Sequence, residues 1–260
     1  MDVRMDGKNA IITGGSRGLG RAMATRFAES GANVAIVARR ADVLAETQLE
    51  IETLTGAKVV ACNADVATAE GVETAFNTAM DGLGQVDIVV NNAGSSMARP
   101  FEEVTDEMWL TDLELKLFAA IRLIRLALPG MKERNWGRII NILNIGAKAP
   151  RAGSTPTTVS RAAGLNLTKS LSLEYAPHGI LVNALCTGLI VTDQLPKMRD
   201  RGAPDKTAEE YQEILGGRIP LGRMGTAEEY ANVACLLASD AGGYVTGTAI
   251  NIDGGSSPAS

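Results

Sequence analysis

The stretch Thr13-Gly14-Gly15-Ser16-Arg17-Gly18-Leu19-Gly20 joins an apolar run at residues 10–12 to an amphipathic run at residues 22–28. These runs predict a strand and a helix, so the glycines lie in a strand-to-helix turn. Glycine permits a backbone that a β-carbon opposes and lets a ligand approach closely. The free N–H groups and the dipole at the helix start attract phosphate. The turn predicts a dinucleotide site formed by Gly14, Ser16, Arg17, Gly18, Leu19 and Gly20.

The spacing of this turn is TGxxxGxG, which differs from the GxGxxG of ordinary dinucleotide dehydrogenases. A glycine pattern alone is a weak signal, because a plain strand-to-helix turn is also rich in glycine. The flanking strand and helix are the context that a cofactor site requires, and they favour the dinucleotide interpretation.

Composition favours one soluble domain that binds a small molecule. The 260 residues are 45% hydrophobic with a net charge of -5, which suits a single α/β core over residues 1–260 and argues against nucleic acid. Residues 1–8 carry four charges, and no later run approaches the ~20 apolar residues of a membrane span. Cys62, Cys186 and Cys235 lack metal or redox spacing, so we expect no metal site, reduced thiols and a cytoplasmic protein.

Strand-like and helix-like runs alternate along the rest of the chain, as in βαβ units that form a parallel sheet. Strands are expected at 33–38, 58–63, 86–90, 138–143, 180–185 and 249–253, and helices at 41–54, 68–83, 107–134 and 157–175. Residues 192–217 are polar and lack a strong period. Because they follow a strand end, we expect a substrate loop or mobile lid there.

Three later motifs arrive in a fixed order after the glycine turn: Asp65-Val66, Asn91-Asn92-Ala93-Gly94 and Asn251-Ile252-Asp253-Gly254-Gly255. With TGxxxGxG, they give residues 7–255 a pattern that resembles the short-chain dehydrogenase/reductase family. The resemblance implies a doubly wound (Rossmann-type) parallel sheet of seven strands with helices on both faces. It also implies a nicotinamide-dependent oxidoreductase that acts on a small molecule and assembles as a homotetramer or homodimer.

The resemblance assigns further cofactor contacts. Asp65 would accept a hydrogen bond from the adenine amino group, and Val66 would pack beside the ring. Asn92, Ala93 and Gly94 would bring backbone close to adenine and ribose. The family's PGxxxT stretch, which holds the nicotinamide, falls on residues 187–192, where Thr187 replaces the usual proline and Ile190 and Thr192 are retained.

The end of the second strand favours NADP(H) over NAD(H). NAD-dependent members of the resembled family carry an acidic residue there, whereas this chain has Ala38 followed by Arg39 and Arg40. Guanidinium groups at Arg39, Arg40 and Arg17 suit a 2′-phosphate. The alternative for Arg40 is that it starts a helix and faces solvent.

The family's catalytic Asn, Ser, Tyr and Lys fall on Lys116, Asn144, Thr157 and Arg161, so none of the four matches. The usual tyrosine proton donor is therefore missing. Arg161 stays charged, so it can hold the nicotinamide ribose and stabilise an alkoxide but cannot shuttle protons. Tyr175 and His178 are interpreted as structural, and Met97, Arg99 and Arg151 as loop residues near substrate without an assigned role.

Two functions remain open from the sequence. In the first, an atypical NADP-dependent carbonyl reductase or alcohol dehydrogenase uses Arg161 and Asn144 on the oxyanion and Thr157 to position substrate, while water or Lys116 delivers the proton. In the second, the protein binds NADP(H) without catalysis, as a sensor or partner subunit. The four replacements are all polar, which suits a working pocket and favours the enzyme.

Overall fold

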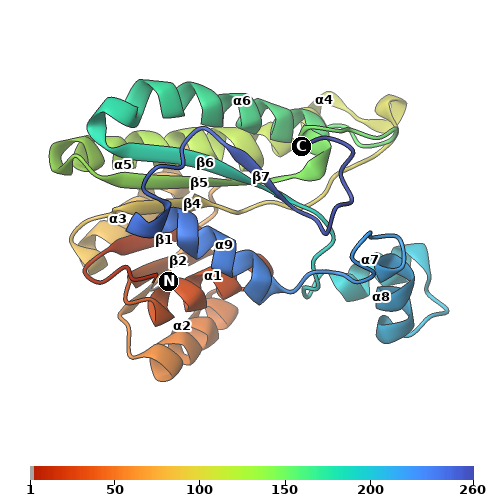
Figure 1. Ribbon diagram of the computed structural model, residues 1–260, viewed down its shortest axis with the longest axis horizontal. Coiled ribbons are helices and arrows are strands. Elements are labelled where there is room, and N and C mark those ends of the chain that lie inside the picture. The colour runs from red at the N-terminus through yellow and green to blue at the C-terminus, as the bar shows by residue number, and fades with distance from the viewer. Residues whose placement is uncertain (1–2) are drawn as a thin grey trace.

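The protein, described over residues 3–260 by a computed structural model, is built on one seven-stranded parallel sheet (Figure 1). The strand order is β3-β2-β1-β4-β5-β6-β7, which is the doubly wound arrangement expected from the alternating sequence. The strands are β1 (Asn9–Thr13), β2 (Asn33–Ala38), β3 (Val59–Asn63), β4 (Ile88–Asn91), β5 (Gly137–Asn144), β6 (Ile180–Thr187) and β7 (Ala249–Ile252).

Helices cover both faces of this sheet. Helices α1, α2 and α9 pack on one face, and α3, α5 and α6 lie over the other (Figure 1). Their bounds are α1 (Gly18–Glu29), α2 (Ala41–Thr55), α3 (Ala69–Leu83), α4 (Asp106–Leu113), α5 (Ala119–Arg134), α6 (Thr157–Tyr175), α7 (Leu195–Gly202), α8 (Ala208–Gly216) and α9 (Ala227–Ala238). Short 3-10 turns follow several strands and helices.

The central strands are apolar without interruption because side chains on both of their faces are buried. In β1, Ile12 packs with α1 and α9 on one face, whereas Ile11 packs with α3 and α5 on the other. This alternation is the two-residue period of a strand covered on both sides. The resulting cores fix the register of the strands, so their carboxyl ends meet at one edge.

The helix expected over residues 107–134 is divided at its centre. Helix α4 ends at Leu113, a π-helical turn η2 spans Glu114–Phe118, and α5 begins at Ala119. The extra residue of a π turn shifts the side chains that follow it around the helix axis. Within this turn Lys116 is buried.

Residues 192–217, expected as an irregular loop, instead contain α7 and α8, which project from the body of the sheet (Figure 1). Helix α8 starts with a capping box in which Thr207 and Glu210 bond each other's backbone N–H. Leu195, Leu215 and Met224 form a small apolar cluster beneath these helices. The polar composition concealed this local core, although Thr207-x-x-Glu210 was a readable start signal.

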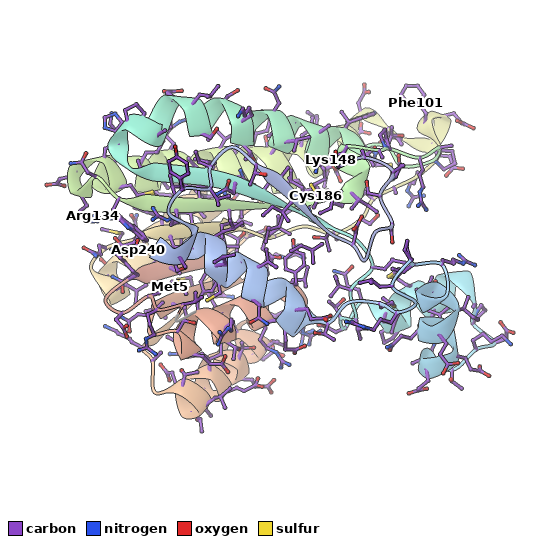
Figure 2. The ribbon with its side chains drawn as sticks, in the orientation of Figure 1. Met5, Phe101, Arg134, Lys148, Cys186 and Asp240 are labelled. Atoms are coloured by element: carbon purple, nitrogen blue, oxygen red, sulfur yellow. The ribbon has the colours of Figure 1, made fainter. Side chains whose placement is uncertain are left out.

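The two edges of the sheet differ in chemistry. At the edge where the strands begin, Arg134 pairs with buried Asp87 at 3.1 Å, and Arg138 pairs with Asp240 at 3.2 Å. Arg134 and Asp240 lie together there, far from Phe101 and Lys148 (Figure 2). Charge pairs occupy this edge, and the candidate site lies at the opposite, carboxyl edge.

No helix among the described residues is long and apolar enough to cross a membrane. The three cysteines are all free and buried. Burial raises the pKa of the Cys62 thiol to about 12, which keeps it protonated and unreactive.

Candidate active site

The glycine turn leaves β1 and enters α1 with the geometry that a pyrophosphate cradle needs. Gly14 and Gly18 have φ of 65° and 52°, a region that favours glycine. A β-carbon on Gly14 would lie 2.9 Å from Asn92 Nδ2, and one on Gly20 would collide with the Gly14 carbonyl oxygen. No side chain caps the start of α1, and its first turn holds no acidic residue. Its N–H groups therefore remain available to an anion.

Asn92 holds this turn in place from the end of β4. Its Nδ2 donates to the carbonyl oxygens of Thr13 and Gly14, at 2.9 and 3.2 Å. The Thr13 hydroxyl accepts in return from the backbone N–H groups of Asn92 and Ala93. The Asn92 side chain is thus committed to the turn, and only the backbone of this segment faces a ligand.

A cavity of about 240 Å³ lies beside the turn at the carboxyl edge. Its lining unites residues from the ends of β1, β2, β3 and β4, which the sequence assigned to one cofactor. They are Gly14, Ser16, Arg17, Arg39, Arg40, Asp65, Val66, Ala93 and Gly94. The cavity and the bare glycine backbone fit the adenosine part of a dinucleotide.

A larger hollow of about 720 Å³ lies over the outer faces of α1, α2 and α9 and shares Ser16 and Arg17 with the first. It lacks Gly14, Asp65 and Gly94, so we assign the cofactor to the smaller cavity. Thr192 lines the larger hollow, and a β-carbon on Gly18 would lie 3.5 Å from the Thr192 side chain. The segment that contains Ile190 and Thr192 therefore lies against the glycine turn.

Arginines surround the end of β2. The Arg39 side chain is 76% exposed, and its guanidinium lies 3.8 Å from the Asp65 carboxylate at the cavity rim. Arg40 precedes α2 and pairs with Asp42 at 3.2 Å, which agrees with its alternative, solvent-facing interpretation. Arg39 and Arg17 are consequently the cations most available to a phosphate at this rim.

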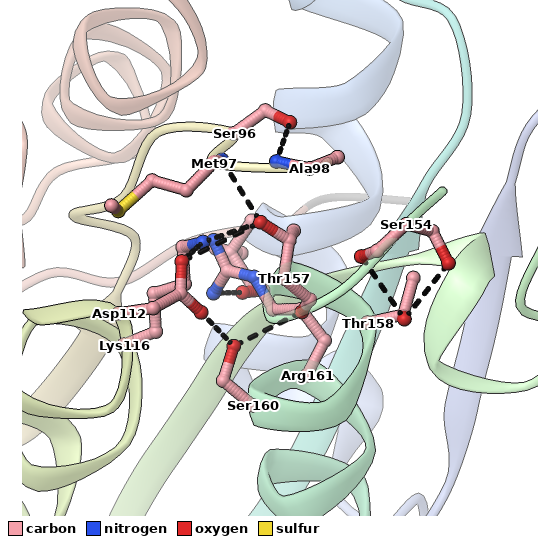
Figure 3. A network of polar contacts seen from close by, with 11 residues as sticks. Ser96, Met97, Ala98, Asp112, Lys116, Ser154, Thr157, Thr158, Ser160 and Arg161 are labelled. Carbon is pink, nitrogen blue, oxygen red and sulfur yellow. Dashed lines mark hydrogen bonds and ion pairs between the residues drawn. The ribbon is translucent and has the colours of Figure 1, made fainter. Parts of the chain in front are cut away.

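Lys116, Thr157 and Arg161 come together beside this cavity (Figure 3). Lys116 Nζ donates to Thr157 Oγ1 at 3.0 Å and forms an ion pair with Asp112. Thr157 Oγ1 also accepts from the Met97 N–H at 3.0 Å. The Lys116 side chain is 1% exposed, so its ammonium is enclosed by these partners.

Asp112 and Ser160 belong to this cluster and were missed by sequence reasoning. Asp112 is 0% exposed, and its second carboxylate oxygen accepts from Ser160 Oγ at 2.6 Å (Figure 3). The only signal in the sequence was the four-residue spacing of Asp112 and Lys116, which usually indicates a surface ion pair. Packing of α6 against α4 and η2 buries the pair instead.

Burial and neighbouring charges both act on Lys116. Desolvation is the largest effect and lowers the pKa of Lys116 from 10.5, and the Arg161 guanidinium lowers it further. Asp112 opposes this by hydrogen bonding and by its charge, which raise the pKa of Lys116. The net direction is downward, as burial beside a second cation requires.

Arg161 connects the cluster to the cavity. Its Nη1 donates to the Ile142 carbonyl oxygen at 2.7 Å, and its Nη2 lies 2.5 Å from where a β-carbon of Gly94 would be. Gly94 lines the cofactor cavity, so a side chain there would displace the guanidinium. Desolvation lowers the pKa of Arg161, yet guanidinium remains charged in proteins.

Asn144 ends β5 on the other side of the site and is paired in register with Thr187 of β6. Its Oδ1 is buried without a hydrogen-bond partner among residues 3–260. A buried acceptor without a partner costs free energy that a bound ligand or water can recover. This amide is therefore fit for binding rather than committed to the fold.

The remaining sequence candidates occupy ordinary structural settings. Arg99 bridges to Thr155 through the backbone and pairs with Glu103 at 4.0 Å, and Arg151 is exposed. Tyr175 packs at the end of α6, and His178 lies in a 3-10 turn. Among these loop residues, only Met97 contacts the cluster, through its N–H.

Comparison with known proteins agrees with this geometry. Residues 14–257 match the family model described as Enoyl-(Acyl carrier protein) reductase. The chain belongs to the short-chain dehydrogenase/reductase family. As a member of this family, the protein is a short-chain oxidoreductase, and its relatives support a nicotinamide cofactor.

Individual relatives span essentially the whole chain. The 3-oxoacyl-[acyl-carrier-protein] reductase FabG of Pseudomonas aeruginosa is 37% identical, over 96% of this chain and 98% of that enzyme. The FabG of Aquifex aeolicus is 32% identical over 98% and 99%. The L-sorbose reductase of Gluconobacter frateurii, solved with NADPH and L-sorbose, matches with a TM-score of 0.96 and 35% identity over 100% of both chains.

Proposed function

We propose that this short-chain dehydrogenase/reductase is an NADP(H)-dependent reductase or dehydrogenase for the carbonyl or alcohol group of a small molecule. The observation that carries the proposal is the position of Arg161, whose guanidinium lies against Gly94 at the wall of the cofactor cavity. We place the substrate carbonyl next to this guanidinium, where a permanent cation would stabilise the negative charge that the carbonyl oxygen acquires.

The cofactor would be held by backbone and cations together. The start of α1 and the turn at Gly14 and Gly18 would bind the pyrophosphate, and Asp65 and Val66 would receive the adenine. Asp65 has a hydrogen bond of 3.1 Å from the Ala67 N–H that fixes its carboxylate at the rim. When bound, the nicotinamide ring supplies or accepts the hydride.

The chain's own residues would stabilise the substrate oxygen. Arg161 carries five N–H donors, and its Nη1 is committed to the Ile142 carbonyl. The Asn144 amide nitrogen is a further donor. Both groups would donate to the oxyanion, and Arg161 would also hold the nicotinamide ribose. Arg161 cannot serve as the acid because it keeps its proton.

The positions of the family's usual Asn, Ser, Tyr and Lys carry Lys116, Asn144, Thr157 and Arg161 here. A threonine hydroxyl lies much nearer the backbone than a tyrosine hydroxyl, and the Lys116 ammonium bonds it at 3.0 Å. Lys116 and water are the two candidate sources of the proton. Thr157, whose hydroxyl oxygen accepts from Lys116 and from the Met97 N–H, would help to position substrate and would not act as the acid.

Turnover of a carbonyl panel tests the proposal. Purified protein is incubated with NADPH and ketones, quinones, enones and imines, including a ketose and a 3-oxoacyl thioester because the relatives act on such substrates. Oxidation of NADPH by at least one of them is expected. NADPH binding without turnover of any of them would contradict catalysis and favour the silent sensor or partner subunit.

Cofactor preference is expected to depend on Arg39. Arg39→Ala removes an exposed guanidinium at the cavity rim, and charge-assisted hydrogen bonds contribute about 1.5–3 kcal/mol, or roughly 10- to 150-fold in affinity. NADPH binding, measured by calorimetry, should weaken by that order while NADH binding changes little. Arg40→Ala is the comparison variant: Arg40 also lines the cavity but pairs more closely with Asp42, so its effect on NADPH binding should be smaller than that of Arg39→Ala. Equal weakening of both cofactors by Arg39→Ala would refute the NADP assignment.

We further propose a homodimer or homotetramer. Large apolar side chains are exposed on the helices that cover one face: Leu110 on α4, Phe118 on η2, and Val159 and Leu173 on α6. Exposed apolar side chains on the outer surface of helices are typical of contacts between subunits. Light scattering should give twice or four times the mass of one chain, and a monomer would contradict this. A cytoplasmic location, which fits three free thiols, is testable by cell fractionation.

A further inference from the structure

A buried phenol lies beneath the end of β6. Tyr230 of α9 is 0% exposed, and its hydroxyl forms a hydrogen bond of 2.8 Å with Thr187 Oγ1. A second, longer contact of 3.4 Å reaches the Leu185 carbonyl oxygen. The Tyr230 ring belongs to the apolar core between α1, α9 and the sheet. Phenylalanine would fill this core equally well, so the hydroxyl needs its partner to offset its burial.

Thr187 is the junction between the sheet and the segment expected to receive the nicotinamide. It is the last residue of β6, in register with Asn144 of β5. The next residues, 188–192, are tied by backbone bonds from Gly188 N–H to the Ile252 carbonyl and from Val191 N–H to the Gly225 carbonyl. The segment then reaches the glycine turn at Gly18. A change in the direction of the chain at Thr187 would therefore move this entire wall of the site.

Thr187 pairs with Asn144 of β5 and Ile252 of β7, and the Tyr230 hydrogen bond adds a side-chain restraint to these backbone pairings. Proline, usual at this position in the resembled sequences, fixes φ near −65° by its ring. Threonine has no such constraint, and this chain places a hydroxyl partner beneath it. The side-chain hydrogen bond thus supplies from α9 the rigidity that the proline ring would supply from within.

We propose that Tyr230 is a positioning residue for the nicotinamide end of the cofactor, acting through Thr187. The inference rests on the proposed cofactor function, because it concerns the same site. It assigns no role to Tyr230 in binding adenosine, since the adenosine cavity is lined by other strands.

Calorimetry with two ligands tests this role. NADPH and 2′-phospho-ADP-ribose share the adenosine half and the pyrophosphate, but only NADPH carries nicotinamide. Tyr230→Phe and Thr187→Val should each weaken NADPH binding by about 3- to 10-fold, the effect of one net hydrogen bond, and change 2′-phospho-ADP-ribose binding less than about twofold. Equal weakening of both ligands, or no effect on either, would overturn the inference.

A rescue separates positioning from general stability. Adding Thr187→Pro to Tyr230→Phe should restore NADPH affinity to within about twofold of the wild type, because the ring fixes φ without a partner. Adding Thr187→Val instead should not. Urea unfolding is measured for every variant to show that it is folded. If the folded double variant Tyr230→Phe, Thr187→Pro still binds NADPH weakly, the inference is contradicted. If the wild-type protein binds neither ligand, the proposed cofactor is refuted together with this inference. If the wild type binds NADPH and the variants bind it equally well, only the inference about Tyr230 is refuted.

Discussion

Asp112→Asn is expected to destabilise the protein by about 3–5 kcal/mol, because it leaves the Lys116 ammonium buried without its counter-charge. Asp112 and the Lys116 side chain are 0% and 1% exposed, so solvent cannot take over the role of the carboxylate. Asparagine keeps nearly the same shape, but its single carbonyl oxygen replaces two accepting oxygens, so the substitution removes the charge together with one of the two bonds from Lys116 and Ser160. Urea unfolding monitored by circular dichroism measures the change.

The pH dependence of this variant gives a second, independent signature. The folded-state pKa of Lys116 is already lowered from 10.5, and Asp112 is the group that raises it. Removal of the Asp112 charge lowers the folded-state pKa of Lys116 further. At pH values between that lowered pKa and about 10.5, Lys116 is protonated in the unfolded chain but not in the folded one. The stability of Asp112→Asn should therefore rise with pH in this window.

The double variant Asp112→Asn, Lys116→Met is the control for the buried charge. It removes the ammonium as well, so it should regain most of the stability lost in Asp112→Asn, and its free energy of unfolding should not rise with pH in this window. A single variant as stable as the wild type at pH 7 would show that Lys116 is neutral or solvated there, contrary to the enclosed geometry.

The sequence predicted the architecture because its signals are local. Each strand is an uninterrupted apolar run between helical runs, and the glycine turn at residues 13–20 can be recognised without knowing its surroundings. The same logic predicts that Gly14, Asp65 and Gly94 lie together, because parallel strands bring their carboxyl ends to one edge, and one cavity is lined by all three. These features require only chain order and the period of each segment.

The features that sequence reasoning missed depend on long-range packing. Asp112 and Lys116 look like a surface pair until α6 covers them, and nothing in the sequence connects Tyr230 to Thr187, 43 residues away. The helices α7 and α8 were concealed because their apolar cluster is small and their exposed faces are polar. In each case a tertiary contact, which the local sequence does not reveal, decides whether a residue is buried and which partner it has.

Arg161→Ala is expected to reduce kcat by about 10²- to 10³-fold with a carbonyl substrate found in the panel, the typical cost of removing one oxyanion donor. The guanidinium lies against Gly94 and is held by the Ile142 carbonyl, so it is fixed before substrate arrives. A donor fixed in advance acts on the charge that develops in the transition state. The loss should therefore appear in kcat more than in KM, as measured at saturating NADPH.

Arg161→Lys is the matched control for this substitution. Lysine keeps a positive charge but loses the planar fork that reaches both Ile142 and the Gly94 side of the cavity. Its kcat should lie between those of the wild type and Arg161→Ala. If Arg161→Ala retained kcat within about threefold, the oxyanion would have to be stabilised elsewhere, and Asn144→Ala measured in the same assay would show whether the amide opposite Thr187 carries that role.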